Sequence, residues 1–262
     1  MNEHGFWRDE SYRFFERNFH GTDLRGMPPA SYVVELLELF PLDLAGARIL
    51  DVGCGAANNL HFLARQYRAR RAVGLEASPD AVAALREAFP EHEFVTGDAA
   101  SLPFEREAFD LVIVRGVLHW VDRSYLLHAL GEALRVCAGY VLLSDFAPLK
   151  PYSVAYRHDR RHRTFKAALQ PILEASGLVR ELGGILHHDG DEWNCMRTTL
   201  YRKLPLDEAY PLRDESAIRR PIVAEELLHA ERVNARAMSE TAATSPRRRA
   251  GSPASAPGKH LQ

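Results

Sequence analysis

Three carboxylates in the first half of the chain each stand at or just after the end of a short apolar run. They are Asp51, Glu76 and Asp98. If these runs are neighbouring parallel strands, their carboxyl ends meet at one edge of a sheet, where ligands of such sheets bind. The sequence therefore predicts an acidic edge that suits a cationic ligand and the hydroxyl groups of a ribose.

The strongest local pattern is Ile-Leu-Asp-Val-Gly-Cys-Gly-Ala-Ala at residues 49–57, a strand that runs directly into a glycine-rich turn. Gly53 and Gly55 allow the backbone to approach a bound ligand closely. Asp51 places a negative charge where a pyrophosphate would otherwise meet a helix N-terminus. A ligand that carries an ammonium and a sulfonium group therefore fits better than NAD.

The two later carboxylates predict recognition of an adenosine. Glu76 follows the glycine turn by about twenty residues, the spacing at which a carboxylate accepts both ribose hydroxyls in nucleotide-binding α/β folds. Asp98, in Val-Thr-Gly-Asp-Ala, comes just after the third strand and can accept a hydrogen bond from an adenine amino group.

The elements that must position these residues alternate between strand-length apolar runs and segments of helical period from about Ala30 to Lys203. This alternation is typical of βα units around a mostly parallel sheet. We expect strands at residues 48–52, 72–76, 93–96, 109–115, 140–146, 179–188 and 196–203. We expect helices at residues 58–67, 79–88 after a Ser78 cap, 124–136 after a Ser124 cap, and 166–174 with Gly177 beyond its end.

The last two predicted strands are joined by Asp189-Gly190-Asp191, which is typical of a tight hairpin. Strands joined in this way are antiparallel, so the sheet ends with a reversed strand. The expected organisation is an N-terminal lid or helix at residues 1–29, a main domain at 30–204, a helical extension at 205–240 and a disordered tail at 241–262. The helix of the extension is expected at about 221–238, and the tail is rich in Ser, Ala, Pro and Gly.

Composition limits the function classes. The apolar fraction is 46%, the charged fraction is 26% and the formal net charge is −2, so nothing favours a nucleic-acid or membrane partner, and a small-molecule partner is expected. The arginines at 247–249 are predicted to be part of a solvated tail. Cys54, Cys137 and Cys195 form no CxxC pair, and the N-terminus lacks the basic and apolar regions of a signal peptide, so we predict a cytoplasmic protein.

With these motifs in place, residues 30–203 resemble the class I S-adenosylmethionine-dependent methyltransferases. The first motif of that family is an acidic residue followed by xGxGxG, and acidic residues end its second and third strands. Ala57 stands here where the third glycine is usual, which bears on how tightly helix and strand can pack. Phe109-Asp110-Leu-Val, Leu134-Arg135-Val136 and the closing hairpin also fit the family's later motifs.

The resemblance implies an α/β, three-layer Rossmann-like sheet, mostly parallel with an antiparallel last strand. It also implies S-adenosylmethionine as cofactor, with the methionine part at Asp51, Gly53 and Gly55, the ribose at Glu76, and the adenine at Asp98 and Ala99. His119, in Arg-Gly-Val-Leu-His-Trp at 115–120, is then the residue nearest the chemistry and the candidate general base, while Asp110 is expected to be structural. The full set of predicted cofactor-binding residues is Asp51, Gly53, Gly55, Glu76, Ala77, Asp98, Ala99, Arg115 and Arg17.

The substrate side of the site is less determined by the sequence. The aromatic N-terminal segment forms either a lid over the cofactor, with Arg17 reaching the methionine carboxylate, or a helix packed on the core. Tyr152, Tyr156 and His158 are candidates for the acceptor wall. His158 and His162, four residues apart, and the pair 187–188 suggest an exposed polar face rather than a metal site, because a third ligand is not evident.

The expected reaction is methyl transfer to an oxygen or nitrogen of a small molecule. Two other functions stay open at this point: a cofactor-binding protein without catalysis, and an NAD-dependent oxidoreductase built on the same glycine turn.

Overall fold

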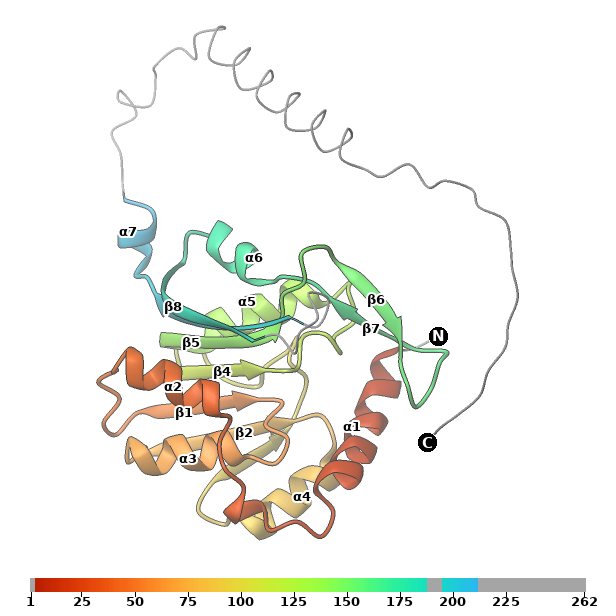
Figure 1. The fold of residues 1–262 in the computed structure, drawn as a ribbon. Coiled ribbons are helices and arrows are strands. Elements are labelled where there is room, and N and C mark those ends of the chain that lie inside the picture. Colours follow the sequence, from red (N-terminus) through yellow and green to blue (C-terminus); the bar gives the residue numbers. More distant parts are fainter. Residues whose placement is uncertain (1–2, 188–194, 212–262) are drawn as a thin grey trace, which may run out of the picture. The chain divides into compact units, whose positions relative to one another are not determined.

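The centre of the protein is a seven-stranded sheet in the order β3-β2-β1-β4-β5-β9-β8, seen in a computed structural model that describes residues 3–187 and 195–211 (Figure 1). Pairing among the first five of these strands is parallel, and β9 runs antiparallel to both β5 and β8. The strands are β1 (Arg48–Val52), β2 (Arg71–Glu76), β3 (Glu93–Thr96), β4 (Phe109–Arg115), β5 (Cys137–Phe146), β8 (Val179–His187) and β9 (Met196–Lys203). The predicted mostly parallel sheet with a reversed last strand is confirmed.

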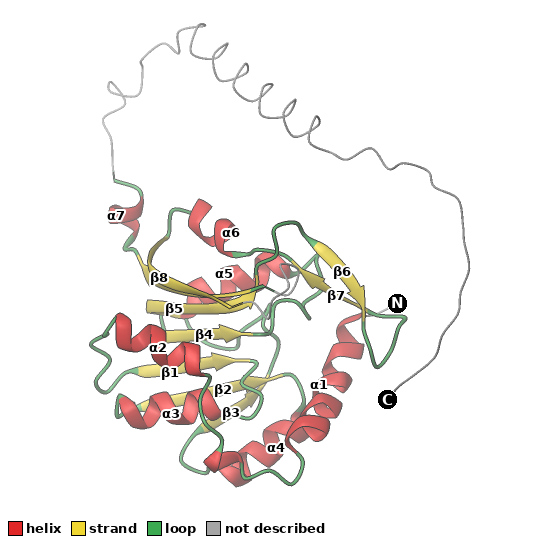
Figure 2. Cartoon of the chain, viewed as in Figure 1, coloured by secondary structure: helices red, strands yellow, loops and turns green. Residues whose placement is uncertain are grey.

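Helices pack against both faces of this sheet, which makes three layers (Figure 2). They are α1 (Glu3–Phe19), α2 (Ser31–Leu39), α3 (Asn58–Gln66), α4 (Pro79–Ala88), α5 (Leu126–Val136), α6 (Gln170–Ala175) and α7 (Leu206–Ala209), with a 3-10 turn η1 (Leu24–Gly26). Because both faces are covered, consecutive residues in the middle of the central strands are buried and apolar, as Leu111–Val114 of β4 are, rather than alternating with polar ones. Leu50 faces the core beneath α5 and α6, whereas Ile49 faces the core beneath α2, α3 and α4.

The predicted caps have different outcomes. The Ser78 hydroxyl accepts a hydrogen bond from the Ala81 amide at 3.4 Å, with Pro79 in the first turn, so the cap of α4 is confirmed. The predicted Ser124 cap is wrong: α5 begins at Leu126, and the Ser124 hydroxyl donates to Asp122 at 2.5 Å instead. The helix starts two residues beyond Ser124, so Tyr125 and not Ser124 occupies the N-cap position.

The segment after β5 differs most from the prediction. A helix was expected over residues 166–174, but α6 begins only at Gln170, and Lys166 belongs to a strand. That strand, β7 (Arg163–Lys166), pairs antiparallel with β6 (Tyr152–Ala155) in a separate two-stranded sheet. The buried positions 164 and 166 alternate with more exposed ones, which is the period of a strand and was not recognised in so short a run.

The start of β5 also differs from the predicted one. β5 begins at Cys137, three residues earlier than expected, because α5 passes into it without a loop. The connection at 189–191, the predicted helix at 221–238 and the tail at 241–262 lie outside the described residues.

Helix α1 and the β6–β7 hairpin lie at the end of the sheet towards which the arrowheads of β1, β2 and β4 point (Figure 1). These two additions therefore stand over the carboxyl edge where the predicted ligand residues end their strands. In the part of the chain that is described, no helix combines the length and the apolar character needed to span a bilayer.

Candidate functional site

A cavity of about 410 Å³ lies at this carboxyl edge, within the size range of small-molecule sites. The sheet supplies one end of its lining, and α1 with the loops after β4 and β6 supplies the other. Six of the predicted cofactor residues line it, namely Gly53, Gly55, Glu76, Ala77, Asp98 and Ala99. The structure thus brings together residues from three strand ends in one space.

The turn after β1 is shaped for close approach of a ligand. Gly53 has φ of +66°, and a Cβ atom there would collide with Val117 of the loop after β4. Ala57, at the position of the usual third glycine, also adopts a left-handed conformation, with φ of +56°, and is fully buried at the start of α3. The alanine therefore preserves the tight packing that the sequence left in question, at a backbone cost of about 1–2 kcal/mol.

Glu76, at the end of β2, accepts hydrogen bonds on both of its carboxylate oxygens. Its Oε1 accepts hydrogen bonds from the Ser11 hydroxyl at 2.6 Å and from the Ala77 amide at 2.7 Å, and its Oε2 accepts one from the Gly55 amide at 3.2 Å. A carboxylate has about four lone-pair positions, so three of them are occupied by the protein. Ser11 was missed by sequence reasoning, because nothing in the sequence of α1 relates it to β2.

Asp51 lies below the cavity lining rather than in it. Its side chain is buried on β1, and burial raises the pKa of the carboxyl group to about 7, with the Arg115 charge opposing and Glu76 adding to the rise. Arg115, at the end of β4, donates to the Tyr32 hydroxyl at 2.6 Å and lies over that ring, and it is not among the cavity-lining residues described. A cation bound nearby would favour the ionised, negatively charged form of Asp51.

Asp98 follows β3 and lines the same cavity. Its Oδ1 accepts a hydrogen bond from the Ala100 amide at 2.8 Å. The backbones of Asp98 and Ser101 form an isolated antiparallel β-bridge. This local turn holds the carboxylate at the sheet edge beside Ala99.

Aromatic residues from three separate segments form the other end of the cavity. We call Trp7 of α1, Trp120 after β4 and Tyr156 after β6 the aromatic wall. Their ring centroids lie 4.9 Å apart for Trp7 and Trp120, 5.4 Å for Trp7 and Tyr156, and 5.2 Å for Trp120 and Tyr156, all edge to face. Of the three predicted wall residues, Tyr156 lines the cavity, whereas Tyr152 and His158 are not in its described lining.

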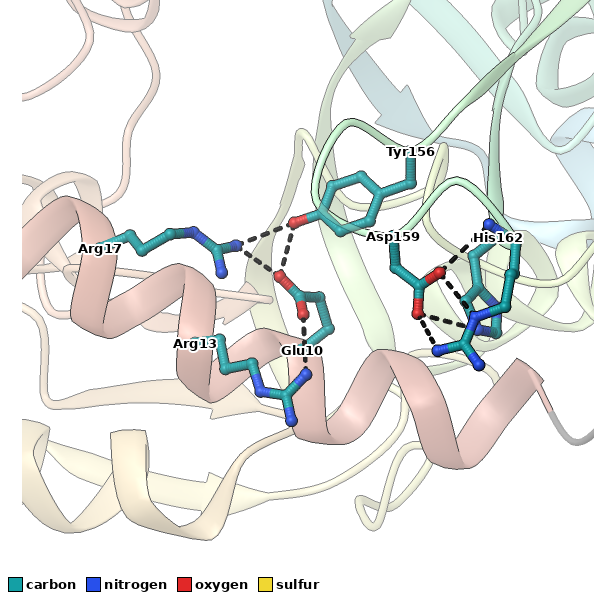
Figure 3. Close-up of polar contacts among 7 residues, drawn as sticks. Glu10, Arg13, Arg17, Tyr156, Asp159 and His162 are labelled. Carbon is teal, nitrogen blue, oxygen red and sulfur yellow. Dashed lines mark hydrogen bonds and ion pairs between the residues drawn. The ribbon is translucent and has the colours of Figure 1, made fainter.

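A buried acidic residue connects α1 with the aromatic wall (Figure 3). Glu10 accepts hydrogen bonds from the Tyr156 hydroxyl at 2.6 Å and from Arg17, and Arg13 approaches its other oxygen at 3.7 Å. Arg17 also donates to the Tyr156 hydroxyl at 2.8 Å. Arg17, predicted to reach the methionine carboxylate, is therefore engaged with Glu10 and Tyr156, and the N-terminal helix both lines the cavity and packs Phe15 into the core.

His119 is buried beside the wall. Its Nδ1 lies 3.0 Å from Oδ1 of Asp145 near the end of β5, and its ring contacts Trp120 at a centroid distance of 4.8 Å. His119 is not among the cavity-lining residues described. Burial lowers the pKa of His119 despite the opposing effect of Asp145, so the imidazole is neutral near pH 7.

Asp145 is the partner that sequence reasoning missed. Burial works to raise its pKa, but hydrogen bonds from His119 and from the Phe146 and Leu118 amides hold the pKa below its ordinary value. Lys166 lies close by, over the Phe146 ring, and burial lowers the pKa of its ammonium to about 8. Asp145 could have been found from the sequence, because it too is an acidic residue at a strand end.

Two predicted structural roles differ in their outcome. Asp110 forms an ion pair with Arg48 at 2.6 Å, between the starts of β4 and β1, and so belongs to the opposite edge of the sheet from the cavity. The expectation of an exposed polar face holds for His158, which is exposed, and is wrong for His162, and neither residue lies in a helix. His162 is buried in the turn between β6 and β7, and its ring stacks on Phe6 at 3.5 Å.

A histidine pair outside the cavity needs a separate account. His61 Nδ1 and His92 Nε2 are 3.1 Å apart, with Glu91 near them, and these three residues could together hold an ion. Both oxygens of Glu91 are bonded by Arg25, at 2.6 and 3.1 Å. Because the carboxylate is committed to this arginine, we assign the cluster to the packing of η1 against α3 and α4.

Comparison with known proteins agrees with the geometry. The family model described as "Methyltransferase domain" matches residues 49–139. The trans-aconitate 2-methyltransferase of Variovorax paradoxus (strain S110) is 33% identical over 129 residues, which cover 49% of this chain and 46% of that protein. The enzyme of the same name from Escherichia coli O157:H7 is 29% identical over 179 residues, covering 67% of this chain and 68% of that protein. The chain thus matches less than half the length of the first of these relatives.

A solved structure shows the same fold. The N-methyltransferase NodS from Bradyrhizobium japonicum WM9, in complex with S-adenosyl-L-homocysteine, superposes with a TM-score of 0.54 at 18% identity, covering 74% of this chain and 99% of that one. The sheet order, the acidic and glycine-rich carboxyl edge and the matched family domain agree. Residues 49–139 thus belong to the methyltransferase domain family, the described fold is similar to that of the class I S-adenosylmethionine-dependent methyltransferases, and the cofactor is S-adenosylmethionine.

Proposed function

We propose that this protein transfers the methyl group of S-adenosylmethionine to an oxygen or nitrogen atom of a small-molecule acceptor. The observation that carries the proposal is the single cavity shared by Glu76, Asp98 and the glycine turn at one end and by the aromatic wall at the other. One end has the groups for an adenosine, and the other has room and surface for a second molecule. We further propose a cytoplasmic location, because all three cysteines are free and buried.

The residues at the sheet end have distinct proposed roles. Glu76 holds the ribose hydroxyls, with Ala77 beside it, and Asp98 with Ala99 holds the adenine. Gly53 and Gly55 let the backbone reach the methionine part, while Asp51 supplies negative charge beneath it. A cation a few ångströms from a carboxylate at this depth gains a few kcal/mol of electrostatic stabilisation.

Arg17 and Arg115 were predicted to contact the cofactor as well. Both already have protein partners in the described structure, Arg17 through one terminal nitrogen and Arg115 through Nε, so the methionine carboxylate would be bound by their other N–H groups. Comparing cofactor affinity in Arg17→Gln and Arg115→Gln tests this part of the proposal: a loss of about tenfold or more supports a direct contact, since such bonds are charge-assisted.

The cofactor supplies an electrophilic methyl group, and the protein's contribution is orientation and the exclusion of water. For a hydroxyl nucleophile we propose that His119 accepts the proton at Nε2, because its Nδ1 is held by Asp145 and its imidazole is neutral. This role requires Nε2 of the buried ring to become accessible when the acceptor binds.

Isothermal calorimetry with S-adenosylmethionine, followed by transfer of a labelled methyl group to a cell extract, tests the proposal. We expect micromolar binding and labelling of a small molecule. Binding without any labelling would favour the non-catalytic alternative, and the absence of binding up to millimolar cofactor would contradict the proposal. Glu76→Ala is the matched variant and should abolish binding.

A further inference from the structure

The acceptor end of the cavity is a preassembled aromatic surface. The three rings of the aromatic wall are inclined to one another by 63° to 84°, and they come from α1, from the loop after β4 and from the loop after β6. Behind them, the stacked pair of Phe6 and His162 contacts Trp7 and Tyr156. Because the rings already hold one another in place, a planar ligand can pack against their edges and faces without a loss of side-chain freedom on binding.

The carboxylate of Glu10 is already paired with cations of the same helix, Arg17 in direct contact and Arg13 at 3.7 Å. Glu10 is only 3% exposed, and its carboxylate is bonded by Arg17 and by the Tyr156 hydroxyl (Figure 3). Arg17 is thus committed to a buried carboxylate and to the wall. A guest that carried its own carboxylate would meet Glu10 without gaining this cation.

The remaining charge of the cavity has the same sign. Besides Glu10, the charged residues of the described lining are Glu76, Asp98 and Asp122, and all three are acidic. Placing like charges together in a site shielded from water is unfavourable, whereas an uncharged guest leaves the existing pair intact.

We propose that the methyl acceptor is an uncharged aromatic molecule that lies against the aromatic wall and presents a hydroxyl or amino group to the cofactor. This inference rests on the proposed function and adds the class of substrate to it. It also separates this protein from any enzyme whose acceptor is a polycarboxylate, since such an acceptor needs cations that are free to bind it.

Two probes that differ in one charge test the proposal. 4-Methylphenol and 4-hydroxybenzoate share a phenol ring and differ by a methyl group against a carboxylate. Their affinities for the full chain, saturated with S-adenosyl-L-homocysteine, can be measured by calorimetry and by saturation-transfer NMR. We expect 4-methylphenol to bind at least about tenfold more tightly. Trp7→Ala should remove most of that binding, and Trp7→Phe should retain it.

A charge variant makes the test specific. Glu10→Gln leaves Arg17 without its carboxylate, so the preference should shift by about tenfold or more towards 4-hydroxybenzoate. Glu16→Gln, an exposed acidic position on the same helix that pairs with His20, is the matched control and should change neither affinity. A structural effect of the glutamine would weaken both probes alike and would not reverse their order.

The outcomes are distinguishable from failure of the proposed function. Equal or tighter binding of 4-hydroxybenzoate to the native protein, no binding of 4-methylphenol at millimolar concentration, or an unchanged ratio in Glu10→Gln would each overturn the inference. In all of these cases, the methyltransferase proposal would stand if the protein still bound S-adenosyl-L-homocysteine and still labelled a small molecule in an extract. Loss of cofactor binding itself would count against that proposal instead.

Discussion

At the scale of single residues, the ionisation of Asp51 determines how binding of a cationic cofactor depends on pH. Its carboxyl group has a pKa of about 7 because it is buried, so near neutral pH it is divided between the protonated and the charged form. A cation bound above it favours the charged form and lowers that pKa. Binding of a cationic cofactor should therefore release a proton whenever Asp51 begins protonated.

The sign of the pH dependence follows from this. Above pH 7 the carboxylate is already charged and affinity for S-adenosylmethionine should be constant, whereas below pH 7 affinity should fall by up to about tenfold per pH unit. Calorimetry from pH 6 to 8, in buffers of different ionisation enthalpy, measures both the affinity and the proton release. Asp51→Asn should bind weakly and without this slope, and a flat profile in the native protein would show that Asp51 does not sense the ligand.

Asp145 acts on the proposed base rather than on the substrate. Because its carboxylate raises the pKa of His119 against the effect of burial, Asp145→Asn should lower that pKa further. We expect a fall in kcat of about tenfold or more, with the acid limb of the pH–rate profile displaced to lower pH. Cofactor affinity should be unchanged. If kcat falls without displacement of the limb, Asp145 supports the fold of the loop and not the basicity of His119.

His119→Ala is the companion variant. General-base removal costs on the order of a hundredfold in kcat for a hydroxyl nucleophile, with little effect on cofactor binding. A variant that retains full turnover would reassign His119 to the packing of Trp120, which its ring contacts.

The residues of the acidic edge illustrate what a sequence can and cannot predict. Asp51, Glu76 and Asp98 were predictable because strand ends and glycine turns are local features. Ser11 and Glu10 were not, because they reach the cavity from a helix whose sequence does not say which surface it covers. Asp145 obeys the same strand-end rule as the others and was overlooked.

At the scale of elements, α1 is attached to both ends of the cavity. Ser11 bonds Glu76 at the cofactor end, and Glu10 bonds Tyr156 at the acceptor end. Since the ribose has two hydroxyl groups and Glu76 has about one lone-pair position left, the Ser11 hydroxyl competes with the ribose. The helix must give up this bond when the cofactor enters.

Ser11→Ala should therefore bind S-adenosyl-L-homocysteine more tightly, by roughly fivefold for a hydrogen bond of about 1 kcal/mol. Surface plasmon resonance or calorimetry measures the change. Ser11→Thr keeps the hydroxyl and should match the native protein. A loss of affinity in Ser11→Ala would mean that Ser11 bonds the ribose itself. The proposed competition between Ser11 and the ribose for Glu76 would then be wrong.

Long apolar or strongly periodic elements were predicted with nearly correct limits, as β4 shows at Phe109–Arg115. The β6–β7 hairpin was not, because each of its strands has four residues and packs against the loop after β4 rather than into the main sheet. Its contact is non-local: the Phe165 amide donates to the His119 carbonyl oxygen at 3.1 Å. No pattern within residues 148–166 encodes that pairing.

At the scale of the described domain, residues 3–187 and 195–211, the cavity is lined by segments that are far apart in the sequence. Its lining draws on α1, on the ends of β1, β2 and β3, and on the loops after β4 and β6. A ligand that bonds several of these segments stabilises the folded state as a whole, by about 2.7 kcal/mol at a concentration one hundred times its Kd. For a domain of this size, 1 kcal/mol corresponds to roughly 2–4 °C in Tm.

Saturating S-adenosyl-L-homocysteine should therefore raise the Tm by about 5–10 °C in scanning calorimetry. NAD at the same concentration should leave it unchanged, because its pyrophosphate would meet Asp51 and the acidic edge. Glu76→Ala should lose the shift while unfolding cooperatively, which separates loss of the site from loss of the fold. A comparable rise with NAD would mean that the carboxylates do not select the cation, and the electrostatic basis of cofactor choice in this domain would have to be abandoned.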